Sequence, residues 1–180
     1  YWIVEQGKSI FMIGQHAAHE RILYEELMTE LKKQNITAQM LLQPLLLKLT
    51  EREKEILQEN KNLLNQFGFS VELIEPQTYA LFSVPFIIKE PSNTKFFLDM
   101  LDLLGEISIE NVYDTKVLTI ATMACKAAVK ANDRLSIQEA TAMIEKLLQL
   151  ENPFTCPHGR PTIIEMTQYE LEKRFKRIQN

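Results

Sequence analysis

The segment Tyr-Trp-Ile-Val-Glu-Gln-Gly-Lys-Ser-Ile-Phe-Met-Ile, residues 1–13, decides how the fold begins. Two runs of strand-forming residues flank a short polar stretch in which Gly7 suits a turn, so the segment predicts a β-hairpin. From Gln15 to about Lys33 apolar residues recur at helical spacing, which predicts a helix directly after the hairpin. A chain that begins already in a strand is also expected to be a piece of a longer protein.

Strands and helices continue to mix along the rest of the chain. Strands are predicted at 45–49, 70–74, 79–84 and 161–166, and helices at 50–67, 93–104, 115–132, 136–150 and from 167 onward. Thr50, Ser136 and Thr167 each precede a Glu by three residues, the capping-box pattern that begins a helix. This order favours an α+β fold over a doubly wound sheet. We expect two subdomains, each a small, mostly antiparallel sheet with packed helices: 1–43 with 133–180, and an external, regulatory subdomain at 44–132.

Composition and charge exclude several classes of protein. The chain has 180 residues, 46% hydrophobic and 24% charged, enough for a core of its own. No apolar stretch approaches the ~18 residues of a membrane span, and the first residues do not form a signal peptide, so we expect a cytoplasmic protein without a membrane partner. A net charge of −4 argues against a domain that grips nucleic acid by its overall field. Two cysteines are too few for a disulfide framework and remain available as thiols or metal ligands.

His16 and Glu20 are the first candidate metal ligands. They are four residues apart at the start of the first predicted helix, so their side chains lie one turn apart on one face. Imidazole and carboxylate groups both bind Zn²⁺ or Mn²⁺. The alternative is a solvated helix face on which this spacing arises by chance. His19 points elsewhere.

Cys156-Pro-His158 is a second candidate, because it places a thiol and an imidazole two residues apart in a loop rich in proline and glycine. The alternative is a buried cysteine in a turn beside a surface histidine. Cys125, on an alanine-rich helix, fits a small buried apolar residue. A cysteine nucleophile paired with His16 or His158 is conceivable, although no sequence context around either cysteine supports it.

Taken together, these motifs resemble a known family. The chain contains Gln15-His-Ala17 followed by Glu20 and Glu25, then Ala124-Cys-Lys126, then Cys156-Pro-His-Gly-Arg-Pro161, in that order. The combination closely resembles the C-terminal domain of the MutL proteins that nick DNA, and the resemblance runs over essentially the whole chain.

The resemblance implies a function and a set of partners. A domain of this family forms homodimers, carries a metal-dependent DNA endonuclease site with Zn²⁺ or Mn²⁺ and follows an ATPase domain through a linker. It implies action in DNA mismatch repair beside the mismatch-recognition protein MutS and a sliding clamp. It assigns His16, Glu20, Cys125, Cys156 and His158 to the metal site. Glu25 lies about 500° around the helix from Glu20 and is not expected to be a direct ligand.

Gly14 is the departure from the family pattern, which begins Asp-Gln-His-Ala where this chain has Gly-Gln-His-Ala. A carboxylate at position 14 would bind the activating metal and help to position the attacking hydroxide, and glycine offers no such oxygen. Two hypotheses follow. The chain is either a nicking endonuclease domain or a non-catalytic dimerisation and clamp-interaction scaffold of the same repair protein.

Two further segments are candidate contact sites. Gln39-Met-Leu-Leu-Gln-Pro44 resembles the clamp-binding peptide of bacterial MutL proteins, with Gln39, Leu41, Leu42 and Pro44 as anchors. The alternative for this segment is an apolar strand entry packed on its own core. The candidates for DNA contact are basic residues near the C-terminus, of which the helical ones also fit a solvated helix face: Arg160, Lys173, Arg174, Lys176 and Arg177.

Overall fold

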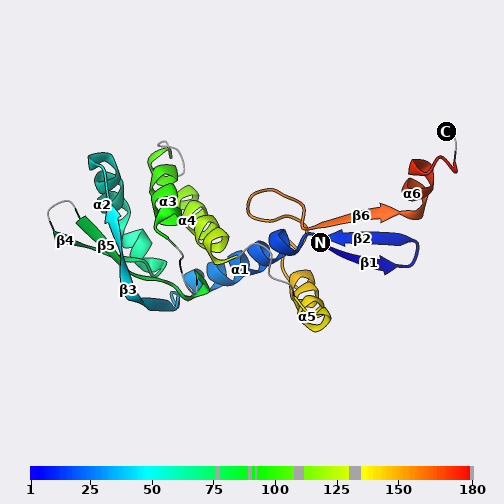
Figure 1. Cartoon of the computed structure of the whole chain (residues 1–180), viewed down its shortest axis with the longest axis horizontal. Helices are drawn as coiled ribbons and strands as arrows, with labels where there is room; N and C mark the ends of the chain where they lie inside the picture. Colours follow the sequence, from blue (N-terminus) through cyan, green and yellow to red (C-terminus); the bar gives the residue numbers. More distant parts are fainter. Residues whose placement is uncertain (76–77, 89–90, 92, 108–111, 130–134, 179–180) are drawn as a thin grey trace. The chain divides into compact units, whose positions relative to one another are not determined.

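The computed structural model of the chain describes residues 1–180 apart from 76–77, 89–90, 92, 108–111, 130–134 and 179–180 (Figure 1). The chain divides into two compact units, Tyr1–Ile22 with Ala131–Asn180 (unit 1) and Leu23–Lys130 (unit 2). Each contains a three-stranded antiparallel sheet and helices, so the predicted α+β class is confirmed. The chain leaves unit 1 within its first helix, and the predicted subdomain limits at 43 and 133 stay a prediction.

The sheet of unit 1 consists of β1 (Trp2–Gln6), β2 (Ser9–Ile13) and β6 (Ile163–Thr167), in the order β1-β2-β6. The first two strands form the predicted hairpin, and Gly7 takes the left-handed backbone conformation of its turn, at φ 64°. The helices of unit 1 are the start of α1 (Gln15–Lys32), α5 (Ile137–Leu148) and α6 (Gln168–Arg174).

One face of this sheet packs on helices. Trp2 lies opposite Ile13, and Ile13 lies opposite Ile163, so the three side chains share a face. All three belong to a hydrophobic cluster that also contains Ala18 and Ile22 of α1 and Leu147 of α5. This cluster is small, with four buried residues among those the structure describes.

Unit 2 holds the larger core. Its sheet consists of β3 (Ala38–Lys48), β5 (Thr78–Pro85) and β4 (Ser70–Glu75), in the order β3-β5-β4. Helices α2 (Glu51–Gln66), α3 (Lys95–Gly105) and α4 (Val112–Ala128) and the short 3₁₀ helix η1 (Phe86–Ile88) pack with it (Figure 1). The core contains fully buried large side chains from sheet, loops and helices, among them Leu81, Phe67 and Met100.

The predicted start of the strand at residue 45 was wrong. We placed it after Pro44, because proline cannot donate a hydrogen bond within a sheet. In the structure β3 already begins at Ala38 and continues through Pro44. Proline is tolerated because β3 is an edge strand whose register shifts between Met40 and Leu45, so Pro44 falls within an irregularity of the ladder.

The three predicted capping boxes are confirmed, at Thr50, Ser136 and Thr167. Each hydroxyl accepts a hydrogen bond from the Glu backbone N–H three residues on, and each Glu carboxylate accepts one from the cap backbone. Backbone and hydroxyl bonds from Ser136 lower the pKa of Glu139. The predicted helix at 115–132 corresponds to α4, and residues 130–132 lie outside the described part. Among the described helices, none has the length and apolar character to cross a membrane.

Candidate metal centre

Sheet register brings the two sequence motifs of unit 1 together. The end of β2 and the start of β6 lie side by side, since Ile13 pairs with Ile163 in the antiparallel ladder. The helix that carries His16 and Glu20 follows β2, and the loop that carries Cys156 and His158 precedes β6. The Gly14 backbone N–H donates to the Thr162 carbonyl at 2.8 Å and so extends the pairing to the first residue before the helix.

The loop before β6 is held closed by its own backbone. The Cys156 N–H donates to the Arg160 carbonyl at 2.8 Å, and the Gly159 N–H donates to the Cys156 carbonyl at 2.9 Å. Gly159 adopts φ 77°, a conformation that glycine takes without steric cost. Thr162 is buried, and its hydroxyl donates to the Pro153 carbonyl across the loop base. No sequence pattern indicates this role of Thr162, because a threonine between a proline and a strand is not distinctive.

Glu20 is a buried carboxylate at the centre of the site, at 2% exposure. Its Oε1 lies 3.2 Å from His16 Nε2, and its Oε2 lies 3.3 Å from His158 Nδ1. Among the described residues, Oε2 nevertheless has no partner with hydrogen-bond geometry. The short distance and the missing hydrogen bond are compatible, because the imidazole lies close but off the direction that a hydrogen bond requires. An unsatisfied buried carboxylate oxygen is costly unless a proton donor or a cation meets it.

Three donor groups lie close together here. One ligand atom each from Glu20, Cys156 and His158 lies within 4.8 Å of the other two. The thiol of Cys156 is buried at 2% exposure, whereas the His158 side chain keeps 27% of its surface accessible. A carboxylate oxygen, a thiolate sulfur and an imidazole nitrogen form a mixed donor set that suits Zn²⁺. The residues present therefore fit a metal ion.

His16 lies on the other side of the carboxylate. Its side chain is 48% exposed, and its Nε2 faces Oε1 of Glu20 one helical turn away. The structure thus brings together four of the predicted metal ligands, three as a compact group and His16 against the second carboxylate oxygen. The cysteine-nucleophile alternative is disfavoured, because both cysteines are buried and reactive thiols are usually partly exposed.

Gly14 has room for a side chain. It lies directly before α1, and its carbonyl accepts the first helical bond, from the Ala18 N–H at 2.8 Å. A Cβ atom at position 14 would lie 3.7 Å from the Ala17 Cβ and 3.8 Å from the Thr162 carbonyl oxygen, which are ordinary van der Waals contacts. Because aspartate is a preferred residue at the start of a helix, Gly14→Asp is compatible with this backbone.

Cys125 and Glu25 belong to unit 2. Cys125 is fully buried in its hydrophobic core, on α4. Glu25 is half-buried on the second part of α1. The assignment of Cys125 to the metal site remains a prediction.

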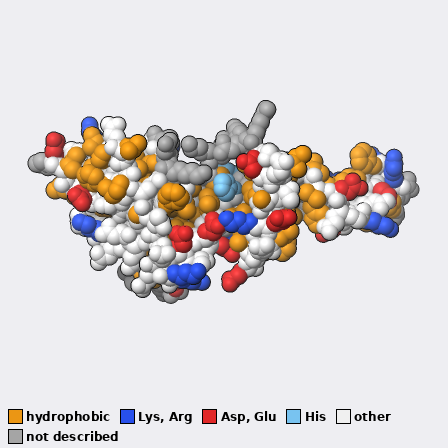
Figure 2. All heavy atoms as spheres, turned by 90° about the horizontal axis from the view of Figure 1, so that it is seen from below, with side chains coloured by type: hydrophobic (Ala, Val, Ile, Leu, Met, Phe, Trp, Pro, Cys, Tyr) orange, Lys and Arg blue, Asp and Glu red, His pale blue; other side chains and the backbone are white. Residues whose placement is uncertain are grey.

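The candidate clamp-binding segment lies where β3 departs from its partner strand. Met40 pairs with Ser83 and Leu45 pairs with Leu81, so residues 41–44 stand opposite Phe82 alone. Leu42 is the most exposed large hydrophobic residue of the described chain, at 107%. Gln39, Leu41 and Pro44 are half-buried. Hydrophobic side chains also gather on the surface at the end of unit 2 that carries β4 and β5 (Figure 2, left).

The candidate DNA contacts near the C-terminus are all exposed. Arg160 lies in the loop beside His158, on the rim of the donor group. The remaining four form the C-terminal basic cluster, on α6 and directly after it: Lys173, Arg174, Lys176 and Arg177. No signal in the structure other than exposure and charge singles these residues out.

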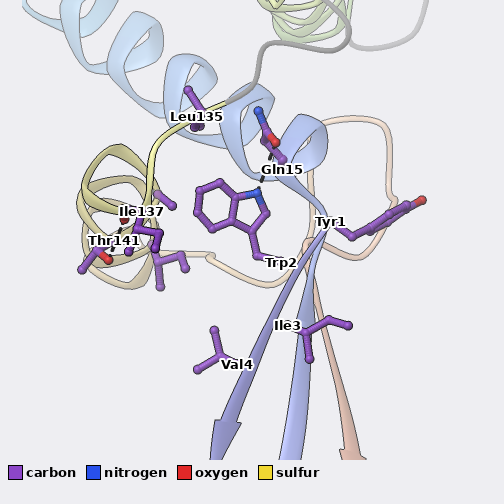
Figure 3. A pocket seen from close by; sticks show the side chains of 10 residues that line it. Tyr1, Trp2, Ile3, Val4, Gln15, Leu135, Ile137 and Thr141 are labelled. Atoms are coloured by element: carbon purple, nitrogen blue, oxygen red, sulfur yellow. Dashed lines mark hydrogen bonds between the residues drawn. The ribbon is translucent and has the colours of Figure 1, made fainter.

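A groove that the sequence did not indicate opens beside β1. It measures about 820 Å³ and is lined mainly by apolar side chains of the hairpin and α5, including Trp2, Val4 and Ile137 (Figure 3). The Trp2 indole Nε1–H donates to the Gln15 side chain at 3.1 Å, which fixes the ring at the groove floor. Trp2 looked like an ordinary strand residue in the sequence.

Comparison with known proteins finds a MutL domain model and MutL proteins of several bacteria. A family model described as the MutL C terminal dimerisation domain matches residues 1–135. The chain is 44% identical over 179 residues to the DNA mismatch repair protein MutL of Clostridium botulinum strain Okra, 41% identical over 179 residues to that of Clostridium tetani, and 40% identical over 178 residues to that of Agathobacter rectalis. Each match covers 99% of this chain but only 27%, 29% and 28% of the respective relative.

Proposed function

The chain belongs to the family of MutL C-terminal dimerisation domains, and we propose that it serves a DNA mismatch repair protein as a homodimerising domain that holds a divalent metal for hydrolytic nicking of DNA. The observation that carries the metal-dependent part is the close grouping of Glu20, Cys156 and His158, in which one buried Glu20 oxygen has no hydrogen-bond partner among the described residues. The dimerising part rests on the family match.

Glu20, Cys156 and His158 would hold the metal. His16, whose Nε2 lies 3.2 Å from Glu20 Oε1, is a further candidate ligand. Thiolate and imidazole groups favour Zn²⁺, whereas Mn²⁺ prefers more carboxylate oxygens than this group offers. When bound, the metal supplies Lewis acidity at the phosphodiester and lowers the pKa of a bound water toward neutrality.

The protein's own residues have distinct tasks in this proposal. The buried start of α1 fixes Glu20, and the closed loop fixes Cys156, so both ligands are presented without loss of side-chain freedom on binding. His158 is partly accessible and marks the side from which a phosphodiester would approach. Arg160 follows it in the same loop and would offer a guanidinium to a phosphate oxygen.

Gly14 supports a second candidate function, the non-catalytic dimerisation and clamp-interaction scaffold. Without a carboxylate at position 14 the protein lacks the oxygen that the family pattern places beside the metal. The metal would then be structural or vestigial, and the domain would contribute dimerisation and binding of partners only.

A plasmid-nicking assay with Mn²⁺ and the cognate sliding clamp separates the two functions. The chain and its Gly14→Asp variant are compared, with Glu20→Ala as the inactive control. Nicking by the native chain that Glu20→Ala abolishes supports the endonuclease and excludes the scaffold. Nicking by Gly14→Asp alone supports the scaffold, because it shows that only the carboxylate at position 14 is missing from the native chain. The room for a Cβ at position 14 lets the variant keep the native backbone, so the two proteins can be compared directly.

Metal binding is tested independently of activity by a zinc titration against a competing chelator. Structural zinc sites bind with ~10–16 kcal/mol over four ligands, so loss of one ligand is expected to weaken binding about 100-fold. Cys156→Ser and His158→Ala should show this loss of zinc affinity. His19→Ala should not, because His19 is an exposed residue of α1 outside the donor group. Cys125→Ala decides whether the buried thiol of unit 2 is also a ligand.

We propose that the segment 39–44 binds the sliding clamp. The fully exposed Leu42 at an irregular edge strand supports this, since an edge segment with projecting apolar side chains can dock into a pocket. Leu42→Ala is expected to abolish clamp binding in surface plasmon resonance without changing thermal stability. Leu46→Ala, on the same strand and 61% exposed, is the matched control.

DNA and MutS are further proposed partners. The chain is acidic, so DNA contact would depend on local basic residues such as the C-terminal basic cluster and on delivery by the clamp. The cooperation with MutS rests on the family match alone.

A further inference from the structure

Thr162 bonds to both elements that carry the donor group. It directly precedes β6 and is 1% exposed. Its carbonyl accepts a hydrogen bond at 2.8 Å from the N–H of Gly14, the residue before the helix that carries Glu20. We call residues 153–161, which carry the other two donors, the donor loop. The Thr162 N–H donates to the Phe154 carbonyl in this loop at 3.0 Å, so one buried residue links the helix to the loop.

The Thr162 side chain adds a third link. Its hydroxyl donates to the Pro153 carbonyl, so Thr162 bonds to two successive carbonyls at the start of the donor loop. A single hydrogen bond leaves a loop free to rotate about it, whereas two bonds to one residue also fix its direction. The hydroxyl bond matters because a buried hydroxyl without an acceptor is costly. The base of the donor loop is therefore fixed by a side chain as well as by the backbone.

Backbone pairing continues from this base to the thiol. Thr155 forms an antiparallel bridge with Pro161, and the Cys156 N–H donates to the Arg160 carbonyl at 2.8 Å. Cys156 thus lies two residue pairs beyond Thr162 along a short ladder. Because each pair is held by the pair before it, a displacement at Thr162 is passed on to Cys156.

We propose that Thr162 is a positioning residue of the metal centre, whose hydroxyl holds the donor loop where Cys156 and His158 meet Glu20. Zinc accepts its ligands only within a narrow range of distances, about 2.0–2.3 Å, so a small shift of the loop lowers the affinity. Groups that orient metal ligands typically contribute about 10–100-fold to metal affinity. This role rests on the proposed metal-binding function and deepens it, since Thr162 acts through the loop rather than as a ligand.

A zinc titration of the 180-residue chain against a competing chelator tests the role of the hydroxyl. Thr162→Val keeps the shape of the side chain and removes the hydroxyl, and it should weaken zinc binding at least about tenfold. Thr162→Ser keeps the hydroxyl donor for the Pro153 carbonyl, so it should bind zinc within about threefold of the native chain.

Ser83→Ala is the matched control for lost stability. Ser83 is a buried residue of unit 2, and its hydroxyl also donates to a backbone carbonyl, that of Gly68 at 2.9 Å. This variant loses the same kind of hydrogen bond as Thr162→Val but lies outside the unit that carries the donor group. It should keep the native zinc affinity, and thermal melts compare the stability of the two variants.

Cobalt in place of zinc reports the arrangement of the ligands. The absorption bands of Co²⁺ depend on the number and geometry of its ligands, and a thiolate ligand adds a charge-transfer band. A displaced donor loop should change these bands in cobalt-saturated Thr162→Val, whereas Thr162→Ser and Ser83→Ala should give the native spectrum. A residue that only stabilises the fold would leave the spectrum of the saturated protein unchanged.

Amide exchange in the native chain keeps the role testable if Thr162→Val does not fold. Coupling between two sites is reciprocal, so a loop base that favours zinc binding must itself be stabilised by zinc. Zinc should therefore slow exchange of the Thr162 and Gly14 amides at least about tenfold, as measured by NMR. The Gln168 amide, which donates to the Lys8 carbonyl at the other end of the β2–β6 ladder, is the control and should change less.

Native zinc affinity and a native cobalt spectrum in Thr162→Val would overturn this role. An equal loss of affinity in Thr162→Ser would also overturn it by assigning the effect to the methyl group, and an equal loss in Ser83→Ala would assign it to general stability. A native chain that binds zinc without slowing exchange at Thr162 likewise contradicts it. A native chain that binds no zinc refutes the proposed metal-binding function itself, so the two failures are distinguishable.

Discussion

Replacing Glu20 by glutamine should raise the stability of the metal-free protein while removing its response to metal. In the absence of a cation the Glu20 carboxylate is 2% exposed, and one of its oxygens lacks a hydrogen bond. An unsatisfied buried polar atom costs about 1–3 kcal/mol, more when charged. Glutamine keeps the shape and a carbonyl acceptor for His16 but removes the charge. We expect a gain of about 1 kcal/mol, which corresponds to about 2–4 °C in melting temperature for a chain of this size.

The same substitution should cost the protein its stabilisation by zinc. Zinc at 100 times its dissociation constant stabilises the native protein by about 2.7 kcal/mol, or about 5–11 °C at the same conversion. Differential scanning calorimetry with and without Zn²⁺ measures both quantities on one sample. Glu25→Gln, further along the same helix, is the control and should retain the zinc response.

Glu20→Gln is thus expected to raise the melting temperature without metal and to remove the rise in melting temperature with zinc. A Glu20→Gln protein that melts lower without metal, and that still gains several degrees with zinc, would show that the carboxylate serves as a structural partner of the two imidazoles. In that case His16 and His158 would be held by Glu20 in the metal-free state, and the donor group would have no need of a cation.

Three other predictions concern stability, pH and DNA. Gly68→Ala should destabilise unit 2 by about 1–2 kcal/mol in urea unfolding, since Gly68 has φ 87° and an added Cβ would lie 3.0 Å from the Ala38 Cβ; Gly7→Ala, with φ 64° and no atom within 4 Å, should cost less. The lowered pKa of Glu139 means that its contribution to the α5 cap is present above pH 4.5 and is lost as the pH falls through the lowered value. Ser136→Ala removes the hydroxyl bond but keeps the backbone bond, the larger cause, so the pKa of Glu139, followed by NMR, should rise only part of the way to its ordinary value. Each alanine substitution in the C-terminal basic cluster that removes a DNA contact should reduce the salt dependence of binding by about one unit of slope, and an unchanged slope would assign the cluster to a solvated helix face.

The sequence predicted local structure well where the signal was itself local. The capping boxes at Thr50, Ser136 and Thr167 and the turn at Gly7 depend on residues within four positions of one another, and each was found where expected. The course of β3 was missed because proline's effect depends on whether the strand lies at a sheet edge, and an edge is defined by residues far away in the sequence.

The grouping of the candidate metal ligands was predicted only through the resemblance to MutL domains. His16 and Glu20 alone were compatible with a solvated helix face, and Cys156 and His158 alone were compatible with a turn. What joins the two pairs is the pairing of Ile13 with Ile163, which no local pattern encodes. The burial of Glu20 was likewise unpredictable, because it depends on the loop that closes over it.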